Sequence, residues 1–355
     1  MFTLSPSPYQ AVDDTRALQG AIASMDAVQL SAGVFIVSDT IWIQNKAGLL
    51  LRGSGKNMGA QGSGSQGTKI VWKGNSTDPL FRISNSRDCV IENFVVESSP
   101  SFPLAAAFLS ENPLGGAFGT TGNVYRDLYL NGGNTNGLQK GFQFVPSGND
   151  ANNDASRFEN VFVNNYTTAA WSFEHAQSKA HVFIGCTFGG FGGQYGVTTA
   201  LGAGGVGGSL SWYGGGGGSN TVADFYLGAP NDAILISNAN CESSNRFLLT
   251  TGPTTGSWPV VLEGCRFSGD TLNADGKAVI FQSVGPLTIV GCDFGDGANG
   301  AALQIYLNPS SSGFGVAIGN QIFSSLLHPF TISGSAAWSL TGNVQALNNA
   351  NTLIS

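Results

Sequence analysis

A short phrase recurs along the chain and limits what the chain can fold into. Two segments of alternating apolar residues flank an Asn, Gly or Asp, as in residues 260–267, Val-Val-Leu-Glu-Gly-Cys-Arg-Phe. The central residue of the phrase stands at positions 93, 127, 160, 185, 238, 264, 291, 319 and 342. The gap from 185 to 238 is about two periods long, which predicts a hidden copy near residue 210. A repeat of roughly 20 to 50 residues indicates a stack of similar structural units.

Each copy predicts two short strands that meet at a corner. Alternation with a period of two is the strand pattern, and in 260–267 it points Leu262, Cys265 and Phe267 inward. The corner favours Asn or Gly because a left-handed backbone costs other residues about 1–2 kcal/mol. Since no helical pattern separates the copies, the sequence predicts an all-β parallel β-helix with one coil per repeat. A propeller or sandwich fits less well, because antiparallel hairpins need tight turns at the strand ends.

The first 55 residues add a helix and a family resemblance. Residues 13–22 predict a helix with Asp13 or Asp14 at its N-terminus and with an apolar stripe of Ala17, Leu18, Ala21 and Ile22. A strand that ends in Ala-Gly-Val-Phe and the phrase Leu-Arg-Gly-Ser-Gly follow. Over residues 10–55 this order resembles the entry to the pectate-lyase-like superfamily of right-handed β-helices, and beyond them the resemblance rests on the repeat alone. That superfamily includes polysaccharide lyases, glycoside hydrolases and bacteriophage tailspikes.

The resemblance implies a right-handed parallel β-helix (solenoid) with a short N-terminal capping helix. We expect residues 1–48 to form the capping helix and entry strands, 49–345 the β-helix with a Gly-rich insertion at 189–219, and 346–355 a C-terminal tail, frayed because the end of the chain is rich in Asn. The segment from Gly53 to Gly67 predicts a surface loop. As a phosphate-binding loop it lacks the Gly-Lys-Ser/Thr ending.

The composition of the chain argues against some classes of binding partner. The formal net charge of −7 disfavours nucleic acid and acidic membrane surfaces, and no apolar run is long enough to span a membrane. The start of the chain lacks a signal peptide, so we expect a removed signal or another route out of the cell. The five Cys predict no disulfide framework, and Cys186, Cys265 and Cys292 share one inward position. A Cys265–Cys292 bond is the open alternative. We expect neither a metal nor another cofactor, because this column offers no His or carboxylate.

A second series of strands lies ahead of the corner phrases and predicts an outward column of polar residues, Gln143, Glu174, Gln282 and Gln304. The Gly-rich segment 189–219 is either an insertion around the hidden coil or a loop beside a groove. In the second case Trp212 and Tyr213 would offer aromatic faces to sugar rings. The four outward residues and these two aromatic residues are the candidate contacts to a ligand.

The candidate chemistry rests on carboxylates and His, because no hydrolase or metal motif is present. Glu174 and His175 are an adjacent acid and imidazole that could supply acid–base catalysis, and Asp224 and Glu242 border the Gly-rich segment. The alternative for each is an exposed or structural residue. Glu92, Glu159 and Glu263 share one place in the repeat, which indicates solvated structural positions.

These observations favour an extracellular or virion-surface protein that binds a polysaccharide and cleaves it near Glu174. A long rigid face suits a polymer better than a small molecule. The alternative is a non-catalytic structural or receptor-binding virion protein, which the scarcity of carboxylates supports. The resemblance to tailspikes implies a homotrimer.

Overall fold

The computed structural model describes residues 1–7, 12–56, 67–112, 119–133, 137–145, 152–202, 206–230, 232–250, 259–268, 276–282, 285–295, 304–307, 314–323, 330–332, 337–347 and 350–354. The chain divides into two compact units. Unit 1 comprises Met1–Ser172 and Ala180–Gly193, and unit 2 comprises Phe173–Lys179 and Gln194–Ser355. Residues 57–66 of the expected loop between Gly53 and Gly67 lie outside the described residues.

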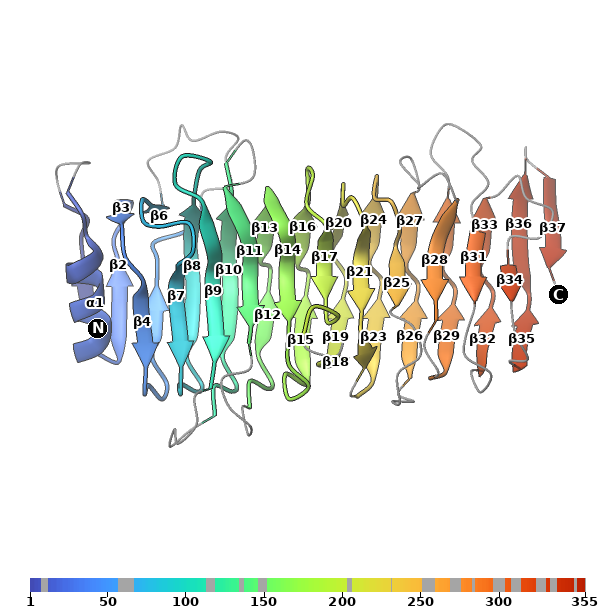
Figure 1. Cartoon of the computed structure of the whole chain (residues 1–355), viewed down its shortest axis with the longest axis horizontal. Coiled ribbons are helices and arrows are strands. Elements are labelled where there is room, and N and C mark those ends of the chain that lie inside the picture. Colours follow the sequence, from blue (N-terminus) through green and yellow to red (C-terminus); the bar gives the residue numbers. More distant parts are fainter. Residues whose placement is uncertain are drawn as a thin grey trace. The chain divides into compact units, whose positions relative to one another are not determined.

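Unit 1 contains the helix α1 (Thr15–Ser24) and two sets of strands (Figure 1). The bent sheet turns at the corners and consists of β1 (Phe2–Leu4), β2 (Ala27–Leu30), β3 (Gly33–Val37), β5 (Leu50–Arg52), β6 (Thr68–Trp72), β8 (Val90–Glu97), β10 (Val124–Asn131), β12 (Arg157–Glu159), β13 (Phe162–Asn164), β15 (His181–Ile184) and β16 (Thr187–Gly189). The second sheet consists of β4 (Ile41–Gln44), β7 (Pro79–Ser84), β9 (Leu104–Glu111), β11 (Leu138–Phe144) and β14 (Tyr166–Phe173).

Unit 2 repeats this arrangement. Its bent sheet consists of β19 (Leu210–Tyr213), β20 (Gly216–Gly218), β23 (Ile234–Ser237), β24 (Asn240–Glu242), β26 (Val260–Glu263), β27 (Arg266–Ser268), β29 (Leu287–Val290), β30 (Asp293–Gly295), β32 (Phe314–Ile318), β33 (Gln321–Phe323), β35 (Ala337–Thr341), β36 (Asn343–Leu347) and β37 (Ala350–Ile354). Its second sheet consists of β17 (Tyr195–Thr198), β21 (Ala223–Leu227), β25 (Leu248–Thr250), β28 (Lys277–Phe281), β31 (Gln304–Leu307) and β34 (Phe330–Ile332), and a short pair is formed by β18 (Val206–Gly207) and β22 (Ala229–Pro230).

The strands pair in parallel from coil to coil, which is the defining feature of a parallel β-helix. Ile91 pairs with Tyr125, and Tyr125 pairs with Phe158 on the following coil. In unit 2 Ile236 pairs with Leu262, and Leu262 pairs with Ile289. Among the described strands β36 and β37 are the antiparallel pair, at the end that we expected to be frayed. The parallel register confirms the predicted fold class.

The predicted corners are confirmed by the backbone. All nine central residues of the phrase have a positive φ, from 51° at Asn160 to 65° at Asn93 and Gly342. Gly214 adds a tenth corner, with a φ of 68°, between β19 and β20. These two strands pair with β23 and β24, which confirms the hidden copy near residue 210. Asn and Gly occupy most corners because they tolerate the left-handed backbone.

The core is built from aligned side chains of successive coils. Leu262, Cys265 and Phe267 are at most 1% exposed, as predicted. In unit 1 the ring of Phe108 stacks on those of Phe81 and Phe142 at 5.0 Å. Each such ring removes a large apolar area from water, and burial of a Phe side chain contributes about 1.5–3 kcal/mol. The stacked rings therefore reinforce the coil register that the strands set.

Helix α1 packs against β1, β2 and β4 (Figure 1) through Leu18, Ala21 and Ile22. Ala17, which we placed in the apolar stripe, is exposed, because the helix turns it away from these strands. The Asp13 carboxylate accepts a hydrogen bond from the Thr15 N–H at 2.9 Å. Asp14 instead accepts one from the Ile36 N–H at 3.0 Å and so ties the helix to β3. That α1 closes the end of the stack remains a prediction.

The five cysteines are buried and free. The Cys265 N–H donates to the Cys292 Sγ at 3.4 Å, so the two thiols lie on adjacent coils as predicted, without a bond between them. Buried Asn side chains continue this column. The Asn320 amide oxygen accepts the Cys292 N–H at 2.9 Å, and the Asn343 amide oxygen accepts the Asn320 N–H at 3.1 Å.

Candidate functional site

The predicted acid–base pair lies in a turn after β14. Glu174 and His175 are both half-buried. The His175 Nδ1 accepts the backbone N–H of Gln177 at 3.1 Å, and the His175 carbonyl accepts the N–H of Ser178 at 3.0 Å. This ring nitrogen therefore shapes the turn. The catalytic role of the pair stays a prediction.

Asp224 and Glu242 do not form a pair on the surface of unit 2. Asp224 is fully buried, and its Oδ1 accepts hydrogen bonds from the Ser244 hydroxyl at 2.6 Å and the Asn220 amide at 2.9 Å. Burial raises the pKa of Asp224 to about 7, against the opposing effect of hydrogen bonds from Ser244, Asn220 and Cys241. Its Oδ2 has no hydrogen-bond partner among the described residues. Glu242 is exposed on β24. A polymer on the surface cannot reach the Asp224 carboxyl.

Trp212 is not available to a ligand. It is fully buried, and its ring meets the edge of Phe225 at 5.6 Å and 83°. The run of glycines concealed the strand alternation of this coil, in which residue 212 points inward from β19. Tyr213, the next residue, points outward and is 43% exposed. The aromatic-face hypothesis for this segment therefore keeps Tyr213 and loses Trp212.

The expected glutamine column is interrupted. Gln304 pairs with Lys277 rather than with Gln282, so these two glutamines do not stack. The side chain of Gln304 is outside the part of the chain that the structure describes. The Gln282 N–H donates to the Thr250 hydroxyl at 2.7 Å. In unit 1 Gln143 is half-buried and pairs with Leu109. The sequence pattern placed the strands correctly and could not fix their register to the residue.

Gln143 belongs to an outward column on the second sheet of unit 1, in which Trp42, Arg82 and Leu109 precede it. The Arg82 guanidinium lies 4.6 Å from the centre of the Trp42 ring and donates two hydrogen bonds, at 2.9 and 2.7 Å, to Glu111. Both charges are therefore satisfied within the protein. No sequence pattern marked Trp42, Arg82 or Glu111 as a candidate site residue.

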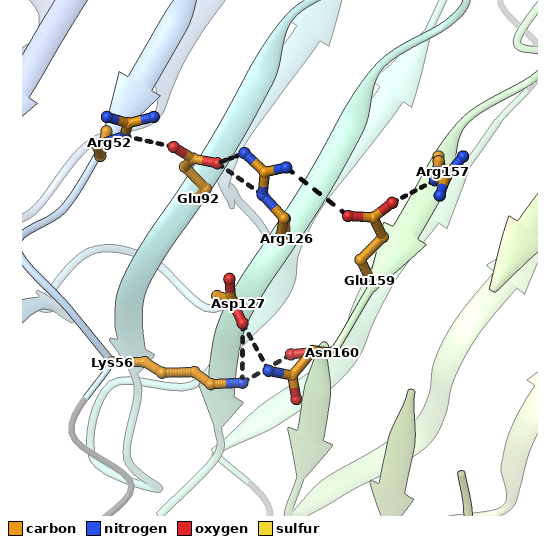
Figure 2. A network of polar contacts seen from close by, with 8 residues as sticks. All are labelled: Arg52, Lys56, Glu92, Arg126, Asp127, Arg157, Glu159 and Asn160. Carbon is orange, nitrogen blue, oxygen red and sulfur yellow. Dashed lines mark hydrogen bonds and ion pairs between the residues drawn. The ribbon is translucent and has the colours of Figure 1, made fainter. Parts of the chain in front are cut away.

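A ladder of alternating charges crosses the bent sheet of unit 1 ahead of the corners. Figure 2 shows Arg52, Glu92, Arg126 and Glu159 on successive strands, where the register pairs each with the next. Glu92 accepts hydrogen bonds from Arg52 and Arg126, the latter through Nε at 2.8 Å. Arg126 also lies 3.8 Å from Glu159. Arg157 completes the network through Glu159. We call these five residues the charge ladder.

The charge ladder corrects the prediction for Glu92. This side chain is 1% exposed rather than solvated, because guanidinium groups cover it from both neighbouring coils. Burial opposes its ionisation, yet the hydrogen bonds from Arg126 and Arg52 hold the pKa of Glu92 below its usual value. The pKa of Arg126 is raised by its hydrogen bond to Glu92. Glu263 is exposed, as predicted. Glu92 is thus a structural anion rather than a proton donor.

The side chain of Lys56 reaches two corner residues beside the charge ladder (Figure 2). Its ammonium donates to the Asn160 carbonyl at 2.7 Å and lies 3.8 Å from the Asp127 carboxylate. The Asn160 amide donates to the same carboxylate at 2.5 Å. Burial lowers the pKa of Lys56, and the nearby Asp127 opposes this effect. The lysine therefore fixes the segment that it belongs to over two corner residues.

An aromatic strip lies beyond the corners of unit 1, and we define it as Tyr129 and Phe162 on the bent sheet together with Phe191, which follows the sheet. The rings of Tyr129 and Phe162 stack at 5.1 Å and 25° on adjacent coils. Thr187 follows Phe162 in the same column. Phe191 comes two residues after β16 and is 69% exposed. Among the large apolar side chains that the structure describes, only that of Met1 is more exposed.

Amides accompany the aromatic strip. Asn131 and Asn164 stand two residues after Tyr129 and Phe162 and pair with each other, and Gly189 pairs with Asn164. The Asn164 Nδ2 donates to the Tyr129 hydroxyl at 3.4 Å, and its Oδ1 accepts no hydrogen bond from a described residue. A β-carbon at Gly189 would lie 2.5 Å from that Oδ1 and 3.6 Å from the Phe191 ring. The missing side chain thus brings the amide and the ring together.

No pattern in the sequence pointed to this strip. Its members come from three coils, and only the pairing register shows that Tyr129, Phe162 and Thr187 form one column. The signal that could have found it is the shared place of Tyr129 and Phe162, each two residues after a corner. No described group of three or more His, Cys, Asp and Glu side chains is arranged to hold a metal ion. No helix among the described residues has the length and apolarity to cross a bilayer.

Comparisons with known proteins identify the class of fold. No protein-family model matches the chain, and neither does any curated protein. Among solved structures, the chain is similar to a catalytic domain of a GH87 α-1,3-glucanase in complex with nigerose, at 10% identity and a TM-score of 0.50. It is also similar to a variant of such a domain in complex with tetrasaccharides, at 12% identity and a TM-score of 0.53.

Each match covers 98% of this chain and 66% of the other, so the chain spans about two thirds of the length of these structures. At such identities the similarity concerns the fold. The chain shares the parallel β-helix of these proteins, in agreement with the resemblance drawn from the corner phrases.

Proposed function

We propose that the protein binds a polysaccharide and that the aromatic strip of unit 1 is its main contact. The carrying observation is Phe191, which is 69% exposed and lies near Asn164, the residue that stands two positions after Phe162 of the stacked pair. Aromatic rings pack against the apolar faces of sugars, and amides bind sugar hydroxyl groups. The solved structures that share the fold were determined with nigerose and with tetrasaccharides, which supports a saccharide as the ligand.

The test is affinity electrophoresis through gels that contain bacterial, fungal and plant polysaccharides. We expect at least one polymer to retard the protein and the Phe191→Ala and Tyr129→Ala variants to lose about ten-fold or more in affinity, since one aromatic contact is worth about 1.5 kcal/mol. Phe314→Ala is the matched control, because Phe314 is a phenylalanine of unit 2 that is 54% exposed. Equal retardation of all four proteins would remove the strip from the proposal.

Cleavage of a polysaccharide by residues of unit 2 is the catalytic form of this proposal. Glu174 and His175 would supply the acid and base of a lyase or glycoside hydrolase, as the only adjacent acid and imidazole in the second series of strands. Incubation with the polymers that bind, followed by assays for reducing ends and for unsaturated uronates, tests it. Activity that survives Glu174→Gln would keep an enzyme and discard this site.

A non-catalytic receptor-binding or structural virion protein is the second candidate. The state of the carboxylates favours it, because Glu92, Glu159 and Glu111 are held by arginines and Asp224 is buried. Binding without any product across the polymer panel would support this candidate, and release of oligosaccharides would exclude it.

Assembly and location follow from the tailspike resemblance and are proposals as well. We expect an extracellular or virion-surface homotrimer. Light scattering should give about three times the mass of one chain, which is 36.6 kDa. A mass of one chain would refute the trimer and favour the single-chain secreted enzymes of the same superfamily.

A further inference from the structure

We propose that the aromatic strip accepts uncharged sugar units and rejects uronates, an inference that rests on the proposed polysaccharide binding. The observation behind it is the ion pairing of the cations that surround the strip. A site for a sugar carboxylate needs a cation that is free to leave its own partner or has none. The described cations next to the strip are all engaged by carboxylates or carbonyls of the protein.

One such cation is Lys69, which shares the column of Tyr129. The register pairs it with Val95, and Val95 with Tyr129. Its ammonium lies 2.8 Å from the Glu97 carboxylate. Glu97 in turn pairs with Asn131, the amide residue next to the strip. A uronate on the strip would therefore meet an anion and a neutralised cation.

The remaining described cations near the strip belong to the charge ladder and Lys56, which lie across the corners from Tyr129 and Phe162. Figure 2 shows that the guanidinium groups of Arg52, Arg126 and Arg157 each contact Glu92 or Glu159. Drawing Arg126 away toward a ligand would leave Glu92, 1% exposed, without half of its partners. Removing one partner from a buried ion pair costs about 3–5 kcal/mol, which is more than a contact at the surface returns.

The strip offers the opposite chemistry. The rings of Phe162 and Phe191 carry no charge, and Phe191 is 69% exposed. Such rings pack against the apolar face of a neutral sugar and offer a carboxylate no charge to pair with. The net charge of −7 adds a long-range repulsion of polyanions. Neutral hexopyranose chains are therefore the class of ligand that fits. Because β-elimination requires a uronate, this class also favours hydrolysis over lyase chemistry for any cleavage.

The experiment compares neutral glucans, mannans and galactans with alginate and polygalacturonate, at about 50 mM and about 500 mM sodium chloride. We expect a neutral polymer to bind with an affinity that changes less than about two-fold between the two salt concentrations, and the uronate polymers not to bind at either. Glu97→Gln should add uronate binding at the lower salt, because it releases Lys69. Glu242→Gln, which removes an exposed carboxylate of unit 2, is the matched control and should add none.

The outcomes separate this inference from the proposed function. Uronate binding by the native protein that Phe191→Ala abolishes would overturn the neutral-sugar inference and keep the strip as the site. A Glu97→Gln protein that still ignores uronates would show that ion pairing is not the cause of the selectivity, and would also overturn the inference. Failure of every polymer to bind would instead remove the proposed function.

Discussion

The buried carboxyl of Asp224 makes the stability of unit 2 depend on pH in a direction opposite to that of most acidic residues. The pKa of this group rises from 3.8 to about 7 because the side chain is fully buried. The unfolded chain releases the proton near pH 4, whereas the folded chain keeps it until about pH 7. Between these values the folded state binds one more proton than the unfolded state. The free energy of unfolding therefore falls as the pH rises, by up to about 1.4 kcal/mol per pH unit.

The whole effect is roughly 4 kcal/mol, since about three pH units separate the two pKa values. It is fully present as stability below about pH 4 and is lost by about pH 7 to 8. Asp224→Asn should remove it. The amide oxygen of the variant can still accept from Ser244 and Asn220, whose donors lie 2.6 and 2.9 Å from the native Oδ1. The free energy of unfolding of the variant, relative to that of the native protein, is then expected to increase steadily over this pH range.

Urea unfolding followed by tryptophan fluorescence, repeated between about pH 4 and about pH 8, measures the difference between the two proteins. Other groups titrate equally in both and cancel. Glu242→Gln is the matched control, because Glu242 is exposed on the strand next to this cluster and should follow the native curve. If the unfolding free energy of Asp224→Asn also follows the native curve across this pH range, the carboxyl is ionised in the folded state and the reasoning fails.

Substitutions at three further kinds of position test the fold and the charge ladder. Glu92→Gln should lower the free energy of unfolding by about 1–3 kcal/mol in urea at neutral pH, and the more exposed Glu159→Gln by less than about 1 kcal/mol. Because the pKa of Glu92 is lowered in the folded protein, this contribution should begin to decline below the ordinary pKa of a glutamate and be lost as the pH falls through the lower pKa of the folded state. Equal losses for the two variants would contradict the role of burial. Gly291→Ala should cost about 1 kcal/mol in thermal unfolding because of its φ of 59°, while Gly291→Asn should cost less, and the reverse order would argue against a left-handed corner. Trp212→Ala should lower the free energy of unfolding by about 3–5 kcal/mol. An unchanged melting temperature would contradict the burial of this ring.

The corners show what the sequence can reveal about this fold. A left-handed residue leaves a local trace, because few residue types tolerate it, and so all nine positions could be named without a structure. The period alone predicted a hidden copy near residue 210, and the structure places its corner at Gly214. Strand parity around each corner then predicted the inward residues Leu262, Cys265 and Phe267.

Contacts between coils left no such trace. Glu92 meets Arg52 and Arg126 only through a register that joins residues 40 and 34 positions away, so its burial could not be read from its neighbours in the sequence. The same holds for the aromatic strip, and for Gln304, which a shift of register places beside Lys277. Trp212 was misplaced for a different reason, because a run of glycines concealed the alternation on which strand parity depends.

The charge ladder also constrains how this part of the protein can change in evolution. Its signs repeat every second coil, in the order Arg52, Glu92, Arg126 and Glu159. Deleting the coil of Glu92 would set Arg52 against Arg126, and like charges opposite each other on paired strands are destabilising. Deleting two coils would restore an Arg–Glu contact. The coils that carry the ladder are therefore expected to be lost or duplicated in pairs, which keeps each Arg opposite a Glu.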